Sequence, residues 1–198
     1  MLGHGEAIWP RWALVALLAG SSPGQQSGPN QDREAAVRVA AIQAAFLLKF
    51  APYVAAASPR PREAGAAVVY RIGILGDDLT AAAVRRLLQG KKVGEATVDV
   101  VTVTEADARA GRAGEFCDQL YLAASVEAEL LQTVRQQHAA KGVLLVSGAA
   151  GFAANGGSIQ LFLQDGNVQF EVNAEALQRQ GLVASSQLLK LSRRGPTR

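Results

Sequence analysis

The sequence is poor in the residues that carry most reaction chemistry. Its 198 residues include one cysteine, Cys117, and two histidines, His4 and His138. A single thiol cannot form an intramolecular disulfide, although a disulfide between two chains stays open. Cys117 precedes an apolar run, so we interpret it as a small buried hydrophobic residue rather than a reactive thiol. No metal-ligand spacing surrounds His138, which argues against a structural zinc site.

Several catalytic and nucleotide-binding motifs are also missing. The complete G-x-G-x-x-G pattern and the G-K-[ST] phosphate loop do not occur. Residues 32–192 contain no G-x-S-x-G nucleophile elbow, and Ser147 before Gly148 is the nearest approach. Asp77 and Asp78 would repel phosphate, and we expect them to cap a helix rather than bind a cation. A catalytic triad assembled only in space stays open, but the sequence favours a protein with no catalytic activity and no cofactor.

Charged residues are scarce as well. Asp, Glu, Lys and Arg make up 19% of the chain, and the formal net charge is +3. Three arginines crowd the C-terminus, and we interpret residues 193–198 as a solvated basic tail. The remainder is nearly neutral, so the chain lacks the clustered basic face of a nucleic-acid-binding protein. The hydrophobic content of 49% allows one domain with its own core, which we place at 32–192.

The N-terminus has the pattern of an export signal. Arg11 precedes the apolar run 12–19, and small residues follow at 20–22. That run is well short of the roughly 20 residues needed to span a bilayer. We therefore predict a signal peptide at 1–22, a flexible tail at 23–31 and a periplasmic location. An uncleaved anchor and a misassigned start codon are the alternatives.

Strand and helix patterns alternate through the middle of the chain. Apolar runs predict strands at 68–75, 98–103, 117–122 and 143–146. Between the first two, we predict a helix whose apolar face comprises Leu79, Ala83, Leu87 and Leu88. A loop or weak helix is expected at 106–114, and Ser125 is expected to cap another helix. This alternation favours an α/β sandwich.

The longest predicted helix covers 32–54. Its apolar stripe at helical spacing comprises Val39, Ile42, Phe46, Phe50 and Tyr53. Pro52 should kink or end this helix, and residues 55–65 are predicted to form a loop. We interpret the helix as a core element laid across a sheet, and the alternative is a helix that docks onto a partner.

A β-hairpin is predicted near the C-terminus. Apolar residues alternate with polar ones at 158–163 and again at 167–172, which is strand periodicity. Asp165-Gly166 between them is a favoured pair for a tight turn. Because a hairpin is antiparallel, it makes the predicted sheet mixed.

Two short helices should follow the hairpin. Asn173 fits an N-cap and Gly181 fits the C′ position after the first of them. Ser185 or Ser186 would cap the second, with Leu188, Leu189 and Leu191 on its apolar face. The predicted fold is therefore α/β, a mixed-sheet sandwich flanked by helices, with a C-terminal β-hairpin and two short terminal helices.

The loop at 148–157 is the best candidate for a binding site. Its Asn155-Gly156-Gly157 segment permits unusual backbone angles and close approach of a ligand, although a tight entry into the hairpin is the alternative. The candidate residues for binding a partner or ligand are Ser147, Phe152, Asn155, Gly156 and Gly157. No residue is proposed for catalysis, for a cofactor or for a metal.

The order of these motifs matches a known pattern. Its positions here are Val146-Ser147, Phe152, Gly156-Gly157, Phe170, Val172-Asn173, Gly181-Leu182, Ser186 and Leu188-Leu189. Upstream positions that fit are Ala44-Ala45-Phe46, Phe50, Tyr53-Val54, 71–78 and 117–122. On these residues the chain resembles the YfiR-type family of bacterial periplasmic proteins, over nearly all of residues 35–192.

The resemblance implies an exported regulator without catalytic activity. Such a protein is similar in role to a repressor that binds the periplasmic sensor region of a membrane-anchored diguanylate cyclase and so controls cyclic-di-GMP. The resemblance also implies a homodimer. The paired cysteines of redox-responsive members are absent, so disulfide control is not implied. The alternative, from another class, is a periplasmic small-molecule binding module with its pocket near Ser147, Phe152, Asn155 and Gly156.

Overall fold

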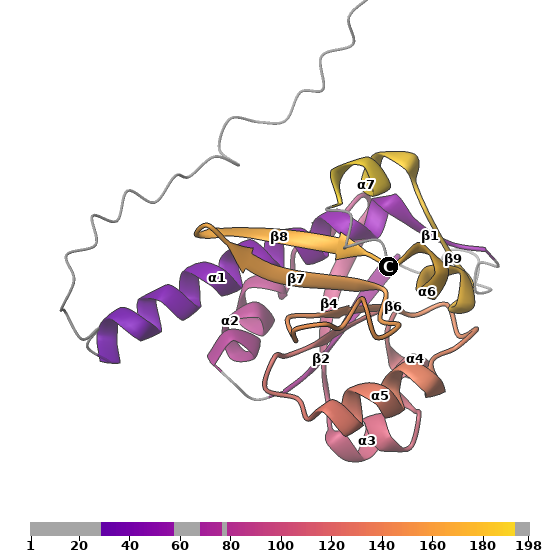
Figure 1. Ribbon diagram of the computed structural model, residues 1–198, viewed down its shortest axis with the longest axis horizontal. Helices are drawn as coiled ribbons and strands as arrows, with labels where there is room; N and C mark the ends of the chain where they lie inside the picture. Colours follow the sequence, from indigo (N-terminus) through magenta and orange to yellow (C-terminus); the bar gives the residue numbers. More distant parts are fainter. Residues whose placement is uncertain (1–28, 58–67, 77–78, 193–198) are drawn as a thin grey trace, which may run out of the picture.

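The computed structural model describes residues 29–57, 68–76 and 79–192. Several predicted features lie outside these residues, namely the signal peptide at 1–22, most of the tail at 23–31, the caps Asp77 and Asp78, most of the loop at 55–65, and the basic tail. The described part is a mixed sheet with helices on both faces, which confirms the predicted fold class (Figure 1).

Within the described residues the central sheet has seven strands, in the order β3-β4-β2-β5-β6-β7-β8. Their bounds are β2 (Val69–Leu75), β3 (Lys92–Val93), β4 (Ala96–Val103), β5 (Gln119–Leu122), β6 (Leu144–Ser147), β7 (Ile159–Gln164) and β8 (Asn167–Val172). The strands from β4 to β7 run parallel, whereas β3 and β8 pair antiparallel at the two edges. All predicted strands are present, and the short edge strand β3 was not predicted.

Helices cover both faces of this sheet. Their bounds are α1 (Pro29–Phe50), α2 (Leu79–Leu88), α3 (Glu105–Arg109), α4 (Ala113–Phe116) and α5 (Ala128–Gln137). We call the side under α1 and α2 the α1 face, and the side under α3, α4 and α5 the α5 face (Figure 1). Strand β2 serves both, because Ile72 and Ile74 belong to the core of the α1 face and Leu75 to that of the α5 face. All of β6 is buried, as expected for a strand covered on both sides.

The predicted hairpin is confirmed as β7 and β8. The strands pair from Ile159 opposite Val172 to Gln164 opposite Asn167. Asp165 has a φ of 52° and Gly166 a φ of 74°, and two positive values at the centre of a two-residue loop define a type I′ turn. Asp165-Gly166 therefore determines both the position of the turn and the register of the two strands.

The two C-terminal helices are also confirmed, as α6 (Ala174–Arg179) and α7 (Ser186–Leu191). Asn173 accepts a hydrogen bond from the N–H of Ala176, and Ser185 accepts one from the N–H of Leu188. Gly181 follows α6 with a φ of 73°, as its predicted position requires.

A second sheet, which was not predicted, joins distant parts of the chain. Strand β1 (Val54–Ala56) pairs antiparallel with β9 (Leu182–Ala184). Residues 55 and 56, which were predicted to begin a loop, therefore belong to a strand, and the prediction is wrong for them. The pairing ties the end of α1 to the segment between α6 and α7.

Helix α1 covers Pro29–Phe50 rather than the predicted 32–54, so residues 29–31 of the predicted tail are helical. Its end before Pro52 confirms the predicted effect of the proline, but its buried side differs from the predicted stripe. It stops at Phe50, and Pro52 lies in the short 3-10 helix η2 (Ala51–Tyr53) that follows. The buried hydrophobic residues are Ala40, Ala44, Leu47 and Phe50. Ile42 is 38% exposed, so its place in the predicted core stripe is wrong. These buried hydrophobic residues share one core cluster with residues of α2 and the sheet, and the small side chains of Ala40 and Ala44 allow close packing there.

Of the described helices, one meets the length and hydropathy of a membrane span, over Arg33–Tyr53. The same segment supplies Ala40, Ala44, Leu47 and Phe50 to the core of the α1 face. Phe50 also lies 5.8 Å from Phe46 and 5.2 Å from Phe170, measured between ring centroids. Side chains packed in this way cannot face lipid, so we interpret α1 as a core helix.

Other helices also differ from expectation in detail. Leu79 is 60% exposed, because α2 buries Ala81, Val84 and Leu88, which share one side at helical spacing. Helix α5 begins with Glu127 as its N-cap rather than Ser125. The region expected to be a loop or weak helix at 106–114 contains α3 and the start of α4. In α7, Leu188 is buried, but Leu189 and Leu191 are exposed, so the predicted apolar face was too wide.

Candidate functional site

The structure divides the five predicted binding residues into two groups. Ser147, Phe152 and Gly157 are buried, whereas Asn155 is exposed and Gly156 is partly exposed. Ser147 ends β6, and its hydroxyl donates to the carbonyl of Leu122 at 2.9 Å and accepts from the N–H of Ala149 at 3.0 Å. The hydroxyl thus fixes the start of the 148–157 loop, with no exposed surface for a ligand.

Phe152 and Gly157 form a packing unit beneath this loop. The Phe152 side chain is 1% exposed and belongs to the core of the α5 face. A Cβ atom at residue 157 would overlap the Phe152 ring. The N–H of Gly157 also donates to the carbonyl of Phe152 at 2.8 Å. Glycine is needed at 157 because the ring occupies the space of a side chain.

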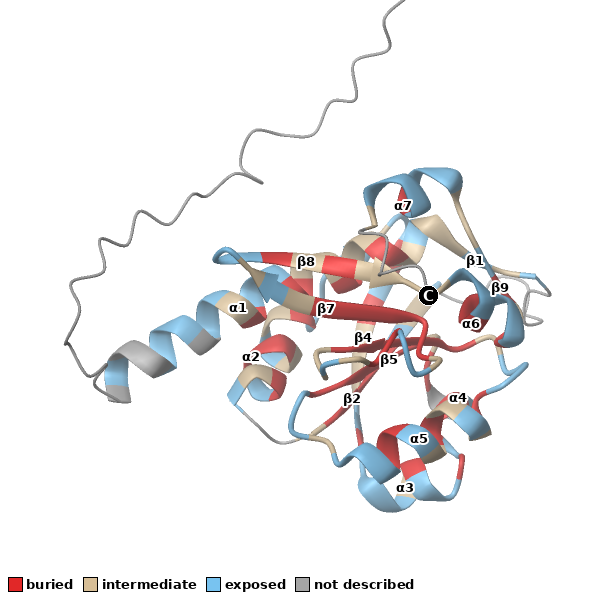
Figure 2. Cartoon of the chain, viewed as in Figure 1, coloured by how far each residue is buried: buried red, intermediate tan, exposed pale blue. Residues whose placement is uncertain are grey.

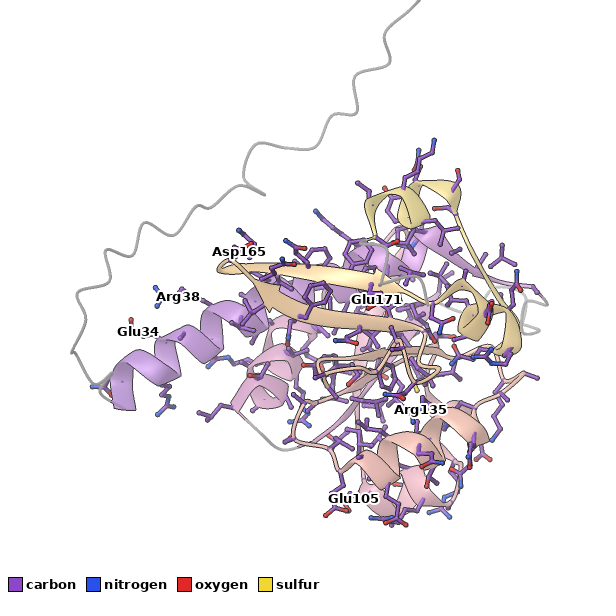
Figure 3. All side chains as sticks on the ribbon, viewed as in Figure 1. Glu34, Arg38, Glu105, Arg135, Asp165 and Glu171 are labelled. Atoms are coloured by element: carbon purple, nitrogen blue, oxygen red, sulfur yellow. The ribbon has the colours of Figure 1, made fainter. Side chains whose placement is uncertain are left out.

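Asn155 and Gly156 line an open cavity of about 540 Å³. The other lining residues are Gln132, Arg135 and Gln136 from α5, Ala139 from the turn after it, and Ala176, Arg179 and Gln180 from α6 and its end. Asn155 is held in place because its Nδ2 donates to the carbonyl of Gly151 at 2.8 Å. Figure 3 labels Arg135 between α5 and the loop. Sequence reasoning found the loop residues but missed the arginines, which no local motif connects to the loop.

Hydrogen bonds between its supporting segments hold the cavity in shape. Asn173 Nδ2 donates to the carbonyl of Ala153 at 2.8 Å, which ties the start of α6 to the loop. The buried Ser158 hydroxyl donates to Oε1 of Gln180, which joins β7 to the end of α6. The N–H of Ala140 donates to the carbonyl of Arg179 at 2.8 Å and so links the end of α5 to α6. The cavity is therefore formed before any ligand enters.

The charges at this cavity are positive. The guanidinium carbon of Arg135 lies 5.7 Å from the centre of the Phe152 ring, within reach of a cation–π contact. Burial lowers the pKa of the Arg135 guanidinium, although arginine remains protonated at neutral pH. Arg179 Nη1 lies 3.9 Å from the carboxylate of Glu175, which is 88% exposed. A pair this open contributes little to stability.

Among the described residues, the histidine and the cysteine lie in the interior. His138 is fully buried, and its Nδ1 lies 2.8 Å from the carbonyl of Val134. Because a carbonyl only accepts, Nδ1 carries the proton of the neutral ring. Burial is the largest cause of its lowered pKa, opposed by the Val134 carbonyl and assisted by Lys141. Cys117 is buried as predicted, and its Sγ donates to the carbonyl of Ala113 at 3.0 Å.

The comparison with family models matches residues 40–193 to a family described as YfiR/HmsC-like. No curated protein matches the chain. Among solved structures, a conserved domain protein from Vibrio cholerae O1 biovar El Tor is 12% identical with a TM-score of 0.53, and the match covers 78% of this chain and 59% of that one. The ABC domain from Streptococcus pneumoniae, solved in complex with L-Trp, is 13% identical with a TM-score of 0.49, over 64% and 55% of the two chains.

The likeness to the Vibrio structure extends to the fold alone, because the sequences share so few identical residues. This chain spans less than two thirds of the length of either structure. Information about function therefore comes from the family match and from the residues themselves.

Proposed function

Since this chain belongs to the YfiR/HmsC-like family, we propose that it is an exported, non-enzymatic regulator. In this proposal it binds a membrane-anchored signalling protein in the periplasm and represses or tunes it. The partner we propose is the sensor region of a diguanylate cyclase, so that cyclic-di-GMP inside the cell is the output. The observation that carries the proposal is the family match over residues 40–193.

The placement of the reactive side chains supports a role without catalysis. Ser147, His138 and Cys117 are each at most 1% exposed. Each of them makes a hydrogen bond to a backbone carbonyl, at Leu122, Val134 and Ala113 respectively. A substrate in solvent could not reach these atoms, and their polar groups already stabilise the fold.

The surface that we propose for the partner is the exposed side of α1, from its N-terminus as far as Ile42. This part of the helix extends beyond the domain body, and it is largely exposed (Figure 2). Val37 is 37% exposed and Ile42 is 38% exposed. Exposed apolar side chains on a projecting helix fit the groove of another protein, where an amphipathic helix docks through spaced anchors. The two functions considered for the helix, core element and docking element, are thus assigned to its buried side and its exposed side.

The first experiment is genetic. Deletion of the gene should raise cyclic-di-GMP, and the full-length protein supplied in trans should lower it again. An alkaline phosphatase fusion to the C-terminus should be active, since that reporter works only after export. Unchanged cyclic-di-GMP in the deletion strain would count against the cyclase as partner, and an inactive fusion would count against export.

The second experiment measures binding to the purified periplasmic region of the cyclase. Ile42→Asp should weaken binding, because a carboxylate would be placed within the apolar contact. Ala128→Asp is the matched control, since Ala128 is an exposed apolar residue of α5, on the opposite face of the sheet from α1. Equal affinities of the two variants would rule out α1 as the docking surface. Light scattering on the same samples tests the proposed homodimer.

A further inference from the structure

The cavity between α5, the 148–157 loop and α6 has a marked imbalance of charge. Its lining contains two arginines, and no aspartate or glutamate is found among the described residues that line it. The remaining polar lining groups are side-chain amides, namely Gln132, Gln136, Asn155 and Gln180. Amides donate hydrogen bonds to anions without opposing their charge. The lining is therefore suited to a ligand that carries negative charge.

The two arginines approach the cavity from different helices. Arg179 lies against the backbone of the loop, since a Cβ atom at Gly156 would be 3.5 Å from Arg179 Nη2. Arg135 lies over Phe152 of the same loop. Both guanidinium groups thus lie beside this loop, which lines the cavity. Planar guanidinium groups are well matched to carboxylate and phosphate, which they bind through paired hydrogen bonds.

Competing interactions at the two arginines are weak. Arg135 makes no ion pair with a carboxylate among the residues that the structure describes. Arg179 has only the long, solvent-exposed contact with Glu175. The carbonyls that end α6 would oppose an anion, but those of Arg179 and Gln180 already accept hydrogen bonds from the N–H groups of Ala140 and Gly142. Little would have to be broken for an anion to bind.

We propose that this cavity binds a small anionic ligand, a carboxylate or a phosphate, between the guanidinium groups of Arg135 and Arg179. Its volume of about 540 Å³ lies within the roughly 300–1,000 Å³ of small-molecule sites. A preformed concave site of this size fits a free metabolite better than the flat contact of a protein partner. The inference is independent of the proposed regulatory role, because it concerns binding by the isolated protein.

Isothermal titration calorimetry tests the proposal on the full chain, in a buffer of low ionic strength without phosphate. The probes are inorganic phosphate and succinate, with neutral succinamide for comparison. We expect one of the two anions to bind at one site in the millimolar range or tighter, and succinamide to give no heat. Added sodium chloride should weaken the binding, since salt screens partly exposed charges. Which anion binds distinguishes a phosphate site from a carboxylate site.

Variants locate the binding. Arg135→Gln and Arg179→Gln should each weaken it about tenfold or more, because each removes a charge-assisted hydrogen bond. Glu175→Gln should strengthen it, since the competing carboxylate is lost. Arg86→Gln is the control, because Arg86 is an exposed arginine of α2 on the α1 face. Circular dichroism confirms folding, and Arg179, with a side chain 56% exposed, gives a variant expected to fold even if Arg135→Gln does not.

Three results would each overturn the proposal. The first is no binding of either anion to the wild type at millimolar concentration. The second is unchanged binding by Arg179→Gln, and the third is equal binding of succinamide. None of these results bears on cyclic-di-GMP or on binding to the cyclase, so failure of this proposal is separate from failure of the regulatory role.

Discussion

The two faces of the central sheet are built differently. The α1 face is packed with apolar side chains, including the cluster of Phe46, Phe50 and Phe170, with centroid separations of 5.2–5.8 Å. The α5 face contains fewer aromatic rings and lies beside the cavity, and His138 is buried in the loop that follows α5. One sheet thus supports a permanently packed layer and a layer next to a preformed site. Changes in the core of the α1 face should lower stability and leave anion binding intact, whereas changes in the core of the α5 face should affect anion binding as well.

The largest expected effects come from one phenylalanine on each face. Phe50→Ala and Phe152→Ala should each lower the free energy of unfolding by about 3–5 kcal/mol, because both rings are buried and leave cavities. Urea denaturation measures this loss. Anion binding should survive only in Phe50→Ala, because Phe152 supports Arg135 and the loop. If both variants bound the anion equally, the division between the faces would be wrong.

A smaller effect is expected at two glycines at either end of the same loop. Gly157→Ala should cost about 1–3 kcal/mol, because the new methyl group overlaps the Phe152 ring and the core must shift. Gly148→Ala is the matched control. Its methyl group would meet no atom closer than 3.6 Å, and neither glycine has a left-handed φ. The two midpoints of thermal unfolding should therefore differ clearly, and equal losses would contradict the packing of Phe152 beneath Gly157.

Other positions show which parts of the fold the sequence could predict. The signals that were read correctly act over a few residues. Asp165-Gly166 bends the chain locally, and Asn173 and Ser185 hydrogen-bond to N–H groups three residues ahead. The hairpin and both terminal helices follow from such contacts, whatever the rest of the fold does.

The features that were missed depend on distant parts of the chain. A helix can be recognised from its spacing, but its rotation depends on what it packs against, so Ile42 and Leu79 were placed inside and are exposed. Strands β1 and β9 were missed because neither has a pattern without the other. The sequence identified only part of the cavity lining for the same reason. Asn155 and Gly156 belong to a recognisable loop, whereas Arg135 and Arg179 come close to that loop only in the folded protein.

A polar contact within the apolar packing of the α1 face gives a more modest prediction. The Tyr121 hydroxyl donates to Gln43 Oε1 at 2.8 Å, between β5 and α1, and both residues are buried. Tyr121→Phe should cost about 1–2 kcal/mol in urea denaturation, because the amide oxygen loses its donor. Gln43→Leu combined with Tyr121→Phe should recover part of that loss. A double variant less stable than the sum of the single ones would show that Gln43 has another role.

The smallest expected effect is the pH dependence of stability that arises from His138, which is buried on the α5 side of the sheet. Burial holds the pKa of His138 below its usual value of 6.5, so the folded protein keeps this ring neutral where the unfolded chain takes up a proton. As the pH falls below about 6.5, the unfolded state therefore gains free energy of protonation that the folded state lacks. Stability should decline through this window and stop responding to His138 below its lowered folded pKa.

The test compares the pH dependence of the unfolding free energy in three proteins. His138→Gln should be less stable at neutral pH, since the ring fills buried space, but its stability should change less between neutral pH and the lowered pKa. Phe50→Ala should keep the wild-type dependence at a lower overall stability, because the surroundings of His138 on the other side of the sheet are unchanged. If His138→Gln followed the wild-type curve in parallel, protonation of His138 would not be linked to folding. The loss of stability at low pH would then have to arise from the protonation of carboxylates elsewhere in the protein.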